Sequence, residues 1–385
     1  MTLELHLRVS VGTGSLAVAI VALTVATAAL ANDVTIESLR TGKEVYDAGC
    51  LACHGPNGEG TPKSTLGFEP PKTFPDFGAC DQTAPETMQN WRAIIRDGGP
   101  ARGFSPIMPA FGDSLSAEQI AAVARHLRGL CQDRSWAPGD LNLPRALFTE
   151  KAYPESEVVI TTSINAEGPP GGSNDFVYER RLGGSSQLEI EVPYEYIHNA
   201  NGGYTTGVGD MTVGLKRMLL WHLNPNGARG SILSVQGEAI LPTGNKSKGL
   251  GTGELALGAF VSYDALLPRD SFLQVQAGGE APISTGELPN AVYMRAALGK
   301  SFAENAGAGR LWSPMLEMLV DRDLESDAVT LWDVVPQFQV TISQRQHVRA
   351  ALGYRWPLNQ TQDRPREVVF YFLWDWFDGG LFEGW

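Results

Sequence analysis

The stretch Cys50-Leu51-Ala52-Cys53-His54 decides how the first part of this chain folds. It places two cysteines three positions apart with a histidine directly after the second, which is the attachment signature for a c-type haem. On one helical turn both thiols can reach the two vinyl groups of a single porphyrin, and the histidine can bind the iron from one face. A redox dithiol or half of a zinc site is the alternative, but the chain has no second cysteine pair of this spacing. We therefore predict one covalent haem c at this stretch.

Helix signals lie on both sides of the cysteines. A capping box at 41–44 predicts a helix that runs into the haem-attachment turn. Apolar side chains at helical spacing predict a second helix over 85–97, which the glycines after it end. Another capping box at 116–119 starts a third helix, whereas the proline-rich stretch 55–77 has to be a loop. The pattern indicates a small all-α domain that wraps one haem.

Met108 is the candidate for the second axial ligand of the iron. It lies in a loop ahead of the third helix, and Pro109 directly after it keeps it out of any helix interior. Met88, by contrast, occupies a helical position on an apolar face, as a core residue does. Ligation by a thioether and an imidazole leaves no open site on the iron and raises its potential. We therefore expect an electron carrier rather than an enzyme such as a peroxidase.

These residues together resemble a known family. The haem-attachment stretch, the glycine-rich loop after it, Met108 with Pro109 and the last amphipathic helix are similar to the single-haem class I cytochromes c. The resemblance covers about residues 36–131 and implies that His54 and Met108 bind opposite faces of the iron. Cys80 and Cys131 depart from the simplest members. In an oxidising compartment these two could form a disulfide, and two buried free thiols are the alternative.

The N-terminus indicates export. Residues 1–31 read as a signal peptide, with Arg8 before an apolar run and Ala29-Leu30-Ala31 as the cleavage site. A retained membrane anchor is the alternative. The net charge of −13 argues against nucleic acid as a partner. The predicted organisation is a signal peptide (1–31), a haem domain (32–134), a proline-punctuated linker (135–154) and a β domain (155–385).

The β domain shows a repeat of two. Apolar residues alternate with polar ones along 188–196, 273–277 and 348–356, and turn clusters such as 224–230 and 243–253 separate such runs. Strands of about ten residues are long enough for a tilted strand to cross a bilayer. Aromatic residues near strand ends would form interfacial girdles, and an aromatic last residue, Trp385, suits barrel insertion. The candidate girdle residues are Tyr194, Tyr196, Tyr354, Trp356, Trp374 and Trp376.

We therefore predict a multidomain fold: an all-α cytochrome c domain followed by an all-β antiparallel outer-membrane barrel of about 12 strands. The alternative is a soluble β domain, because a core face and a lipid face look identical in sequence. The segments GVGDMTVGLK (207–216) and EAILPTGN (238–245), with the later Gly-Thr-Gly, resemble outer-membrane transporter-like proteins linked to meta-cleavage phenol degradation. In this interpretation Asp210 is a turn or lumen residue rather than a catalyst.

The combination predicts electron transfer by a haem c that the barrel tethers to the outer membrane. With an even strand number both barrel ends emerge in the periplasm, so the haem domain should face it and exchange electrons with a periplasmic redox protein. A channel for small, possibly aromatic, solutes, with the haem domain as an accessory, is the alternative function.

Overall fold

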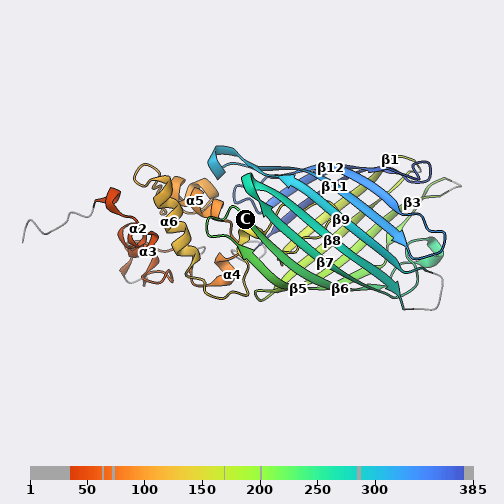
Figure 1. Cartoon of the computed structure of the whole chain (residues 1–385), viewed down its shortest axis with the longest axis horizontal. Helices are drawn as coiled ribbons and strands as arrows, with labels where there is room; N and C mark the ends of the chain where they lie inside the picture. The colour runs from red at the N-terminus through yellow and green to blue at the C-terminus, as the bar shows by residue number, and fades with distance from the viewer. Residues whose placement is uncertain are drawn as a thin grey trace, which may run out of the picture. The chain divides into compact units, whose positions relative to one another are not determined.

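The computed structural model describes residues 35–62, 65–71, 74–168, 170–199, 202–283 and 288–376. From Thr41 onward the described chain forms one compact unit. The predicted signal peptide and Trp385 lie outside the described residues, so the expectations about them stay predictions. The described chain begins with helices and continues as antiparallel strands (Figure 1).

The helical part follows the boundaries that its capping signals predict. Thr41 and Ser116 each accept a hydrogen bond from the backbone N–H three residues on, and both capping boxes are complete. Gly98, at φ 81°, ends the helix between them. No helix among the described residues is long and apolar enough to span a membrane. The elements are η1 (Ile36–Ser38), α2 (Gly42–Gly49), α3 (Leu51–His54), α4 (Cys80–Thr83), α5 (Met88–Asp97), η3 (Gly99–Arg102), α6 (Ala117–Arg128) and η4 (Gly139–Leu141).

The first and last long helices of this part pack closely on each other. Gly42 lies where α2 meets α6, and a Cβ atom at this position would lie 2.1 Å from the carbonyl oxygen of Ala122. Glycine is therefore the residue that permits this contact. Around it Val45 and Tyr46 of α2 and Val123 of α6 are buried, and they form the core on which the haem-attachment turn rests.

The β part is a single antiparallel sheet that closes on itself. Its ends meet because β9 pairs with β11, and the closed ring contains 12 strands of 10–13 residues among the described residues. The short β4 pairs with β3, as β5 does, and comes just before β5 in the chain. The two-residue β10 follows β9 and, like β9, pairs with β11. The predicted antiparallel barrel is confirmed. The strands are β1 (Glu157–Glu167), β2 (Gly171–Leu182), β3 (Ser186–His198), β4 (Tyr204–Val208), β5 (Met211–Leu223), β6 (Gly230–Leu241), β7 (Ala256–Leu267), β8 (Ser271–Pro282), β9 (Ala291–Lys300), β10 (Phe302–Ala303), β11 (Leu311–Asp323), β12 (Leu331–Thr341), β13 (Val348–Pro357) and β14 (Arg366–Asp375).

The barrel wall has polar side chains on its inner face and apolar side chains on its outer face, the reverse of a soluble β protein. Inward side chains include Gln274 and Glu317, both 0% exposed, whereas Leu298 and Phe372 on the outer face are 56% and 54% exposed. A soluble sandwich would bury its apolar face, so this polarity matches a barrel whose outside meets lipid. Among the predicted girdle aromatics, Tyr194, Tyr196 and Trp356 are exposed, but Trp376 is buried and its ring lies 6.1 Å from that of Tyr178.

The glycine-rich motifs of the β domain meet at one rim of the barrel. Asp210, between β4 and β5, accepts hydrogen bonds from the backbone N–H groups of Gly244 at 2.9 Å and Thr252 at 2.7 Å. It therefore fastens the loop 242–255 to the wall. The contact agrees with the turn role expected for Asp210.

Candidate functional site

The cysteines of the attachment stretch lie where two helices meet. Cys50 ends α2, Cys53 lies in α3, and both are half-buried free thiols. The backbone N–H of His54 donates to the carbonyl of Cys50 at 2.9 Å, so one helical turn carries the whole stretch. Burial, and then the neighbouring Cys53, raises the pKa of the Cys50 thiol to about 11. Since neither cysteine forms a disulfide, both sulfur atoms are free for covalent attachment.

His54 lies in an aromatic pocket. Its ring stacks on Phe74 at 5.0 Å between centroids and lies 5.0 Å from the ring of Phe77. Burial lowers the pKa of the His54 imidazole to about 4, so the ring is neutral, which is the form that binds metals. Its Nδ1 atom is buried and has no hydrogen-bond partner among the described residues. An apolar pocket with a neutral imidazole fits an axial ligand of a porphyrin iron.

Tyr46 positions the residue that follows His54. Its side chain is 0% exposed, and its hydroxyl donates to the carbonyl of Gly55 at 2.6 Å. Gly55 has φ 73°, a left-handed conformation that glycine adopts without strain, and it ends α3. This bond links the core of α2 and α6 to the exit of the attachment turn.

Met108 lies outside any helix, as the sequence predicts. Its carbonyl accepts from Gly99 at 3.0 Å, and its N–H donates to Ser105 at 3.2 Å. A Cβ atom at Gly99 would lie 2.2 Å from the Ser105 carbonyl oxygen and 3.2 Å from Cβ of Met108. Glycine therefore allows the methionine loop to close on η3. Met88, the alternative methionine, is in the first turn of α5.

Cys80 and Cys131 are joined by a disulfide in the structure. The bond connects the start of α4 to the chain just after α6, across 51 positions of sequence. The loop that it closes contains α5, the Met108 loop and α6. The disulfide therefore stabilises the part of the domain that follows the attachment stretch in the sequence.

The residues present fit a covalently bound haem. Two free thiols one helical turn apart, a buried imidazole with an unpartnered nitrogen, and a non-helical methionine provide the donors that such a group needs. When bound, haem c supplies reversible one-electron chemistry at its iron.

A second site was not anticipated from the sequence. The segment 137–156, which lies mostly within the predicted linker 135–154, contacts inward-facing side chains all around the barrel, and we call it the luminal segment. Its backbone N–H groups donate, in chain order, to side chains of β12, β11, β8, β7 and β3. The bonds run from Arg145 to Gln339 (3.0 Å), Leu147 to Gln337 (3.0 Å), Thr149 to Glu317 (2.6 Å), Glu150 to Gln276 (3.1 Å), Ala152 to Asp264 (2.8 Å) and Glu155 to Gln187 (2.7 Å).

These bonds explain how an irregular segment can be buried. A backbone N–H removed from water needs an acceptor, and the barrel wall supplies one at each of these positions. Apolar side chains of the segment add a packed core: Leu147, Leu141 and Leu143 each belong to a different cluster with inward-facing wall residues. The luminal segment is therefore an integral filling of the barrel.

Ion pairs complete the attachment of the luminal segment. The buried guanidinium of Arg145 contacts Glu157 of β1 at 2.9 Å and Glu179 of β2 at 2.8 Å. Lys151 pairs with Glu155 and, at 3.5 Å, with Glu157. A buried charge left without its partner is costly, so these pairs specify one position for the segment.

The helical part also contacts the barrel rim directly. Arg102 of η3 is 2% exposed, and its guanidinium donates to the carbonyls of Gly307 and Ala308, the latter at 2.9 Å. These acceptors lie between β10 and β11, at η7 (Glu304–Gly307). Gln344, in the turn between β12 and β13, donates to the carbonyl of Pro100 at 2.6 Å. These turns occupy the rim where β1 begins and β14 ends.

Sequence comparison agrees with the haem site. Residues 37–127 match the family described as cytochrome c oxidase, cbb3-type, subunit III. No curated protein matches the chain.

Solved structures that are similar to the chain include an outer membrane channel and two porins. An outer membrane channel from Pseudomonas putida is 12% identical, with a TM-score of 0.44, over 61% of this chain and 100% of its own. The NanC porin is 6% identical, with a TM-score of 0.41, over 57% of this chain and 99% of its own. The KdgM porin is 6% identical, with a TM-score of 0.36 and the same coverage. The family match and the strand pairing together make this chain a cbb3-type cytochrome c domain at residues 37–127 followed by a 12-stranded antiparallel barrel.

Proposed function

We propose that this protein is an electron carrier with a single haem c, which its barrel tethers to the outer membrane. The observation that carries the proposal is the union of a cytochrome c domain with a barrel whose outside is apolar and whose lumen holds a segment of the protein's own chain. A cytochrome c domain fits an electron carrier, and the barrel would attach this carrier to the outer membrane.

The proposed roles of the haem-site residues follow from their chemistry. Cys50 and Cys53 would hold the porphyrin through thioether bonds, and His54 and Met108 would bind the iron from its two faces. Such ligation leaves no coordination site for a substrate, which favours electron transfer over peroxidase chemistry. The hydrogen bond from the buried Tyr46 hydroxyl to the Gly55 carbonyl holds the end of the histidine turn in place.

The geometry of the barrel supports a periplasmic haem domain. The start of β1 pairs with the end of β14, so both barrel ends lie at one rim, and Arg102 binds the chain at that same rim. Outer-membrane barrels have short periplasmic turns and longer external loops. The rim near Arg102 has turns such as 183–185 and 268–270, whereas the opposite rim carries the loop 242–255. The exchange partner would be a soluble periplasmic redox protein.

The luminal segment favours a tether over the alternative, a channel for small solutes. Backbone and side chains of the luminal segment occupy the barrel across several wall strands, and apolar clusters form inside it. We expect liposomes that contain the purified protein not to swell in small sugars or aromatic acids. Rapid swelling would support the channel instead.

A reductive titration of the purified protein, followed by its visible spectrum, tests the haem assignment. We expect one covalent haem per chain with a low-spin spectrum. Met108→Ala should lower the potential and open a ligand site, whereas the matched Met88→Ala should change neither. A colourless protein, or a Met108→Ala protein with the spectrum and potential of the wild type, would refute the proposed ligation.

Proteinase treatment of intact cells tests the orientation. A periplasmic haem domain is protected until the outer membrane is opened. Cleavage of the helical domain from outside would refute the proposed orientation.

A further inference from the structure

A cavity lies between the helical part and the rim of the barrel. Its volume is about 1050 Å³, which matches the largest ordinary ligand sites, at about 1,000 Å³. Residues of α5 and α6 line it on one side, and the turn between β7 and β8 and the end of β9 line it on the other. Charged residues such as Arg92 and Lys300 lie in its wall together with apolar ones such as Ile120. A ligand that fits this wall has a charged end and an apolar part.

Arg92 belongs to the face of α5 that meets the barrel. Gln89, three residues before it, packs on Gly307, where a Cβ atom would lie 2.8 Å from Cγ of Gln89. Arg96, four residues after it, donates to the carbonyl of Asn305 at 3.1 Å. Residues at this spacing share one helix face, so Arg92 lies between two contacts with η7. Its Nε atom is nevertheless buried without a hydrogen-bond partner in the described chain.

Arg269 and Lys300 bring two further cations to the same cavity. Arg269 lies in the turn between β7 and β8 (η6, Pro268–Asp270), and Lys300 ends β9. The two segments are adjacent, because the N–H of Ser301 donates to the carbonyl of Asp270 at 2.8 Å. Neither cation forms an ion pair with any residue that the structure describes. Both are therefore available to an anion in the cavity.

The wall of the cavity carries an excess of positive charge. Two of its carboxylates have cationic neighbours, since Asp140 pairs with Arg128 at 2.9 Å and Glu86 lies 3.6 Å from His347. Asp270 also lines the cavity and has no ion pair within the described ranges. This one carboxylate faces the three unpaired cations of α5, η6 and β9. At least two positive charges therefore lack a counter-ion, so the charged end of the ligand is negative.

One wall of the cavity continues the outer face of the barrel. Along β9 and β10 the pairing with β11 keeps one register, with Leu298 opposite Leu316 and Phe302 opposite Trp312. Alternation therefore places Lys300 and Phe302 on the same outward face as Leu298. Leu298 and Phe302 are both exposed, and the Lys300 ammonium lies 5.0 Å from the centre of the Phe302 ring. The cavity thus borders the surface that meets lipid.

We propose that this cavity binds an anionic phospholipid of the surrounding membrane, with its phosphate at Arg92, Arg269 and Lys300 and its acyl chains along the apolar wall toward Phe302. A phosphate supplies the missing negative charge and accepts paired hydrogen bonds from arginine. Basic pockets beside apolar surface at the membrane boundary suit anionic headgroups. A free phosphate ion would leave the apolar wall uncovered. The proposal rests on the proposed membrane location of the barrel and is independent of the haem chemistry.

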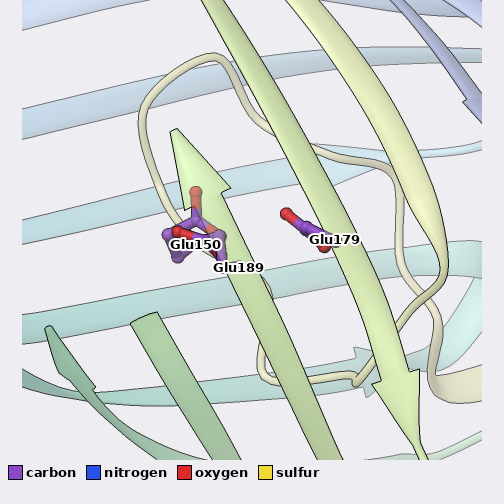
Figure 2. Close-up of side chains that lie close together, drawn as sticks. All are labelled: Glu150, Glu179 and Glu189. Atoms are coloured by element: carbon purple, nitrogen blue, oxygen red, sulfur yellow. The ribbon is translucent and has the colours of Figure 1, made fainter. Parts of the chain in front are cut away.

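The acidic cluster inside the barrel offers no comparable site. Glu150, Glu179 and Glu189 lie close together there, with one oxygen atom of each within 4.8 Å of the others (Figure 2). Arg145 contacts Glu150 and Glu179 at 2.8 Å each. Lys216 lies 3.6 Å from Glu150. Buried cations of the chain already hold these carboxylates, whereas the cations of the rim cavity have no such partners.

The test uses the full-length haem-containing protein, washed free of lipid in a non-ionic detergent. Titration followed by native mass spectrometry should show one retained phosphatidylglycerol per chain, bound at least tenfold more tightly than phosphatidylethanolamine, whose headgroup has no net charge. Glycerol 3-phosphate has the charged end without the acyl chains, so an equal concentration should not displace the lipid. Equal binding of the two phospholipids, or displacement by glycerol 3-phosphate, would overturn the proposal. This comparison does not depend on any variant folding.

Variants locate the site. Arg92→Gln combined with Arg269→Gln should lose at least tenfold in affinity for phosphatidylglycerol. Arg229→Gln is the matched control, since Arg229 is exposed in the turn between β5 and β6 at the same rim but does not line the cavity. Equal binding by the double variant, or an equal loss in the control, would contradict the assignment.

Flotation with vesicles separates this proposal from the proposed function. Protein that floats with phospholipid vesicles but shows no preference for phosphatidylglycerol would refute the lipid site alone. Protein that does not float would refute the membrane location on which the lipid site rests. The haem spectrum should be the same in the wild type and all variants, because the cavity contains none of the proposed haem ligands.

Discussion

Removing the Cys80–Cys131 disulfide tests how the helical domain is stabilised. The bond closes a loop between residues 51 apart in sequence, and this loop contains α5, Met108 and α6. The double substitution Cys80→Ser and Cys131→Ser removes the cross-link, so the unfolded chain regains the conformational entropy that the closed loop had restricted. For a loop of this length the chain-entropy relation predicts a loss of about 4 kcal/mol in the free energy of unfolding. Both cysteines are half-buried, so serine can be hydrated in their place.

Guanidinium unfolding in detergent, followed by the haem absorption band, reports on the helical domain alone. With a slope of about 2–6 kcal/mol per molar guanidinium, the midpoint should fall by about 0.7–2 M. The wild type treated with a mild thiol reductant is the matched control, because it loses the same bond without a substitution. A midpoint that stays within about 0.2 M of the wild type at an unchanged slope would refute the loop-entropy reasoning.

Three further substitutions test single contacts. Gly42→Val should destabilise the helical domain by about 1–3 kcal/mol or prevent its folding, because its side chain would overlap the Ala122 carbonyl; the haem-band midpoint measures this. Tyr46→Phe leaves the Gly55 carbonyl without its buried donor and should cost about 1–3 kcal/mol in the same assay, and an unchanged midpoint would count against the bond. Arg145→Ala strands buried carboxylates and should cost about 3–5 kcal/mol, seen as a lower temperature at which the barrel loses its compact gel mobility.

The parts of the fold that depend on near neighbours were predictable from the sequence. The complete capping boxes at Thr41 and Ser116 define helix starts because both partners lie within one turn. The haem stretch is equally local, since Cys50, Cys53 and His54 share one helical turn. The period-two alternation predicted the strands, and it requires only that successive side chains point to opposite faces.

The alternation along a strand does not by itself say which face is buried, so the outward apolar face was predicted only through the hypothesis of an outer-membrane barrel. Leu298 and Gln274 each lie in a strand where apolar and polar residues alternate. This pattern is the same whether the apolar or the polar face points to the inside. Only closure of the sheet through the pairing of β9 with β11 assigns Gln274 to the inside and Leu298 to the outside.

The burial of the luminal segment was not predicted. A proline-rich stretch between two domains is typical of an exposed linker, and its one unusual signal was the presence of Arg145 and Lys151 among apolar residues. Inward glutamines such as Gln187 and Gln339 are acceptors for this segment, but in the sequence they look the same as the polar lining of an open pore.

The sequence by itself therefore determined the haem-attachment turn, the starts of α2 and α6 and the existence of the strands. Tertiary structure alone decided that the luminal segment enters the barrel and that Glu150, Glu179 and Glu189 meet. The physical reason is the range of the interactions. A cap or a haem motif is completed within a few residues, whereas the N–H of Arg145 finds its acceptor 194 positions away, on a strand that only the closed sheet brings beside it.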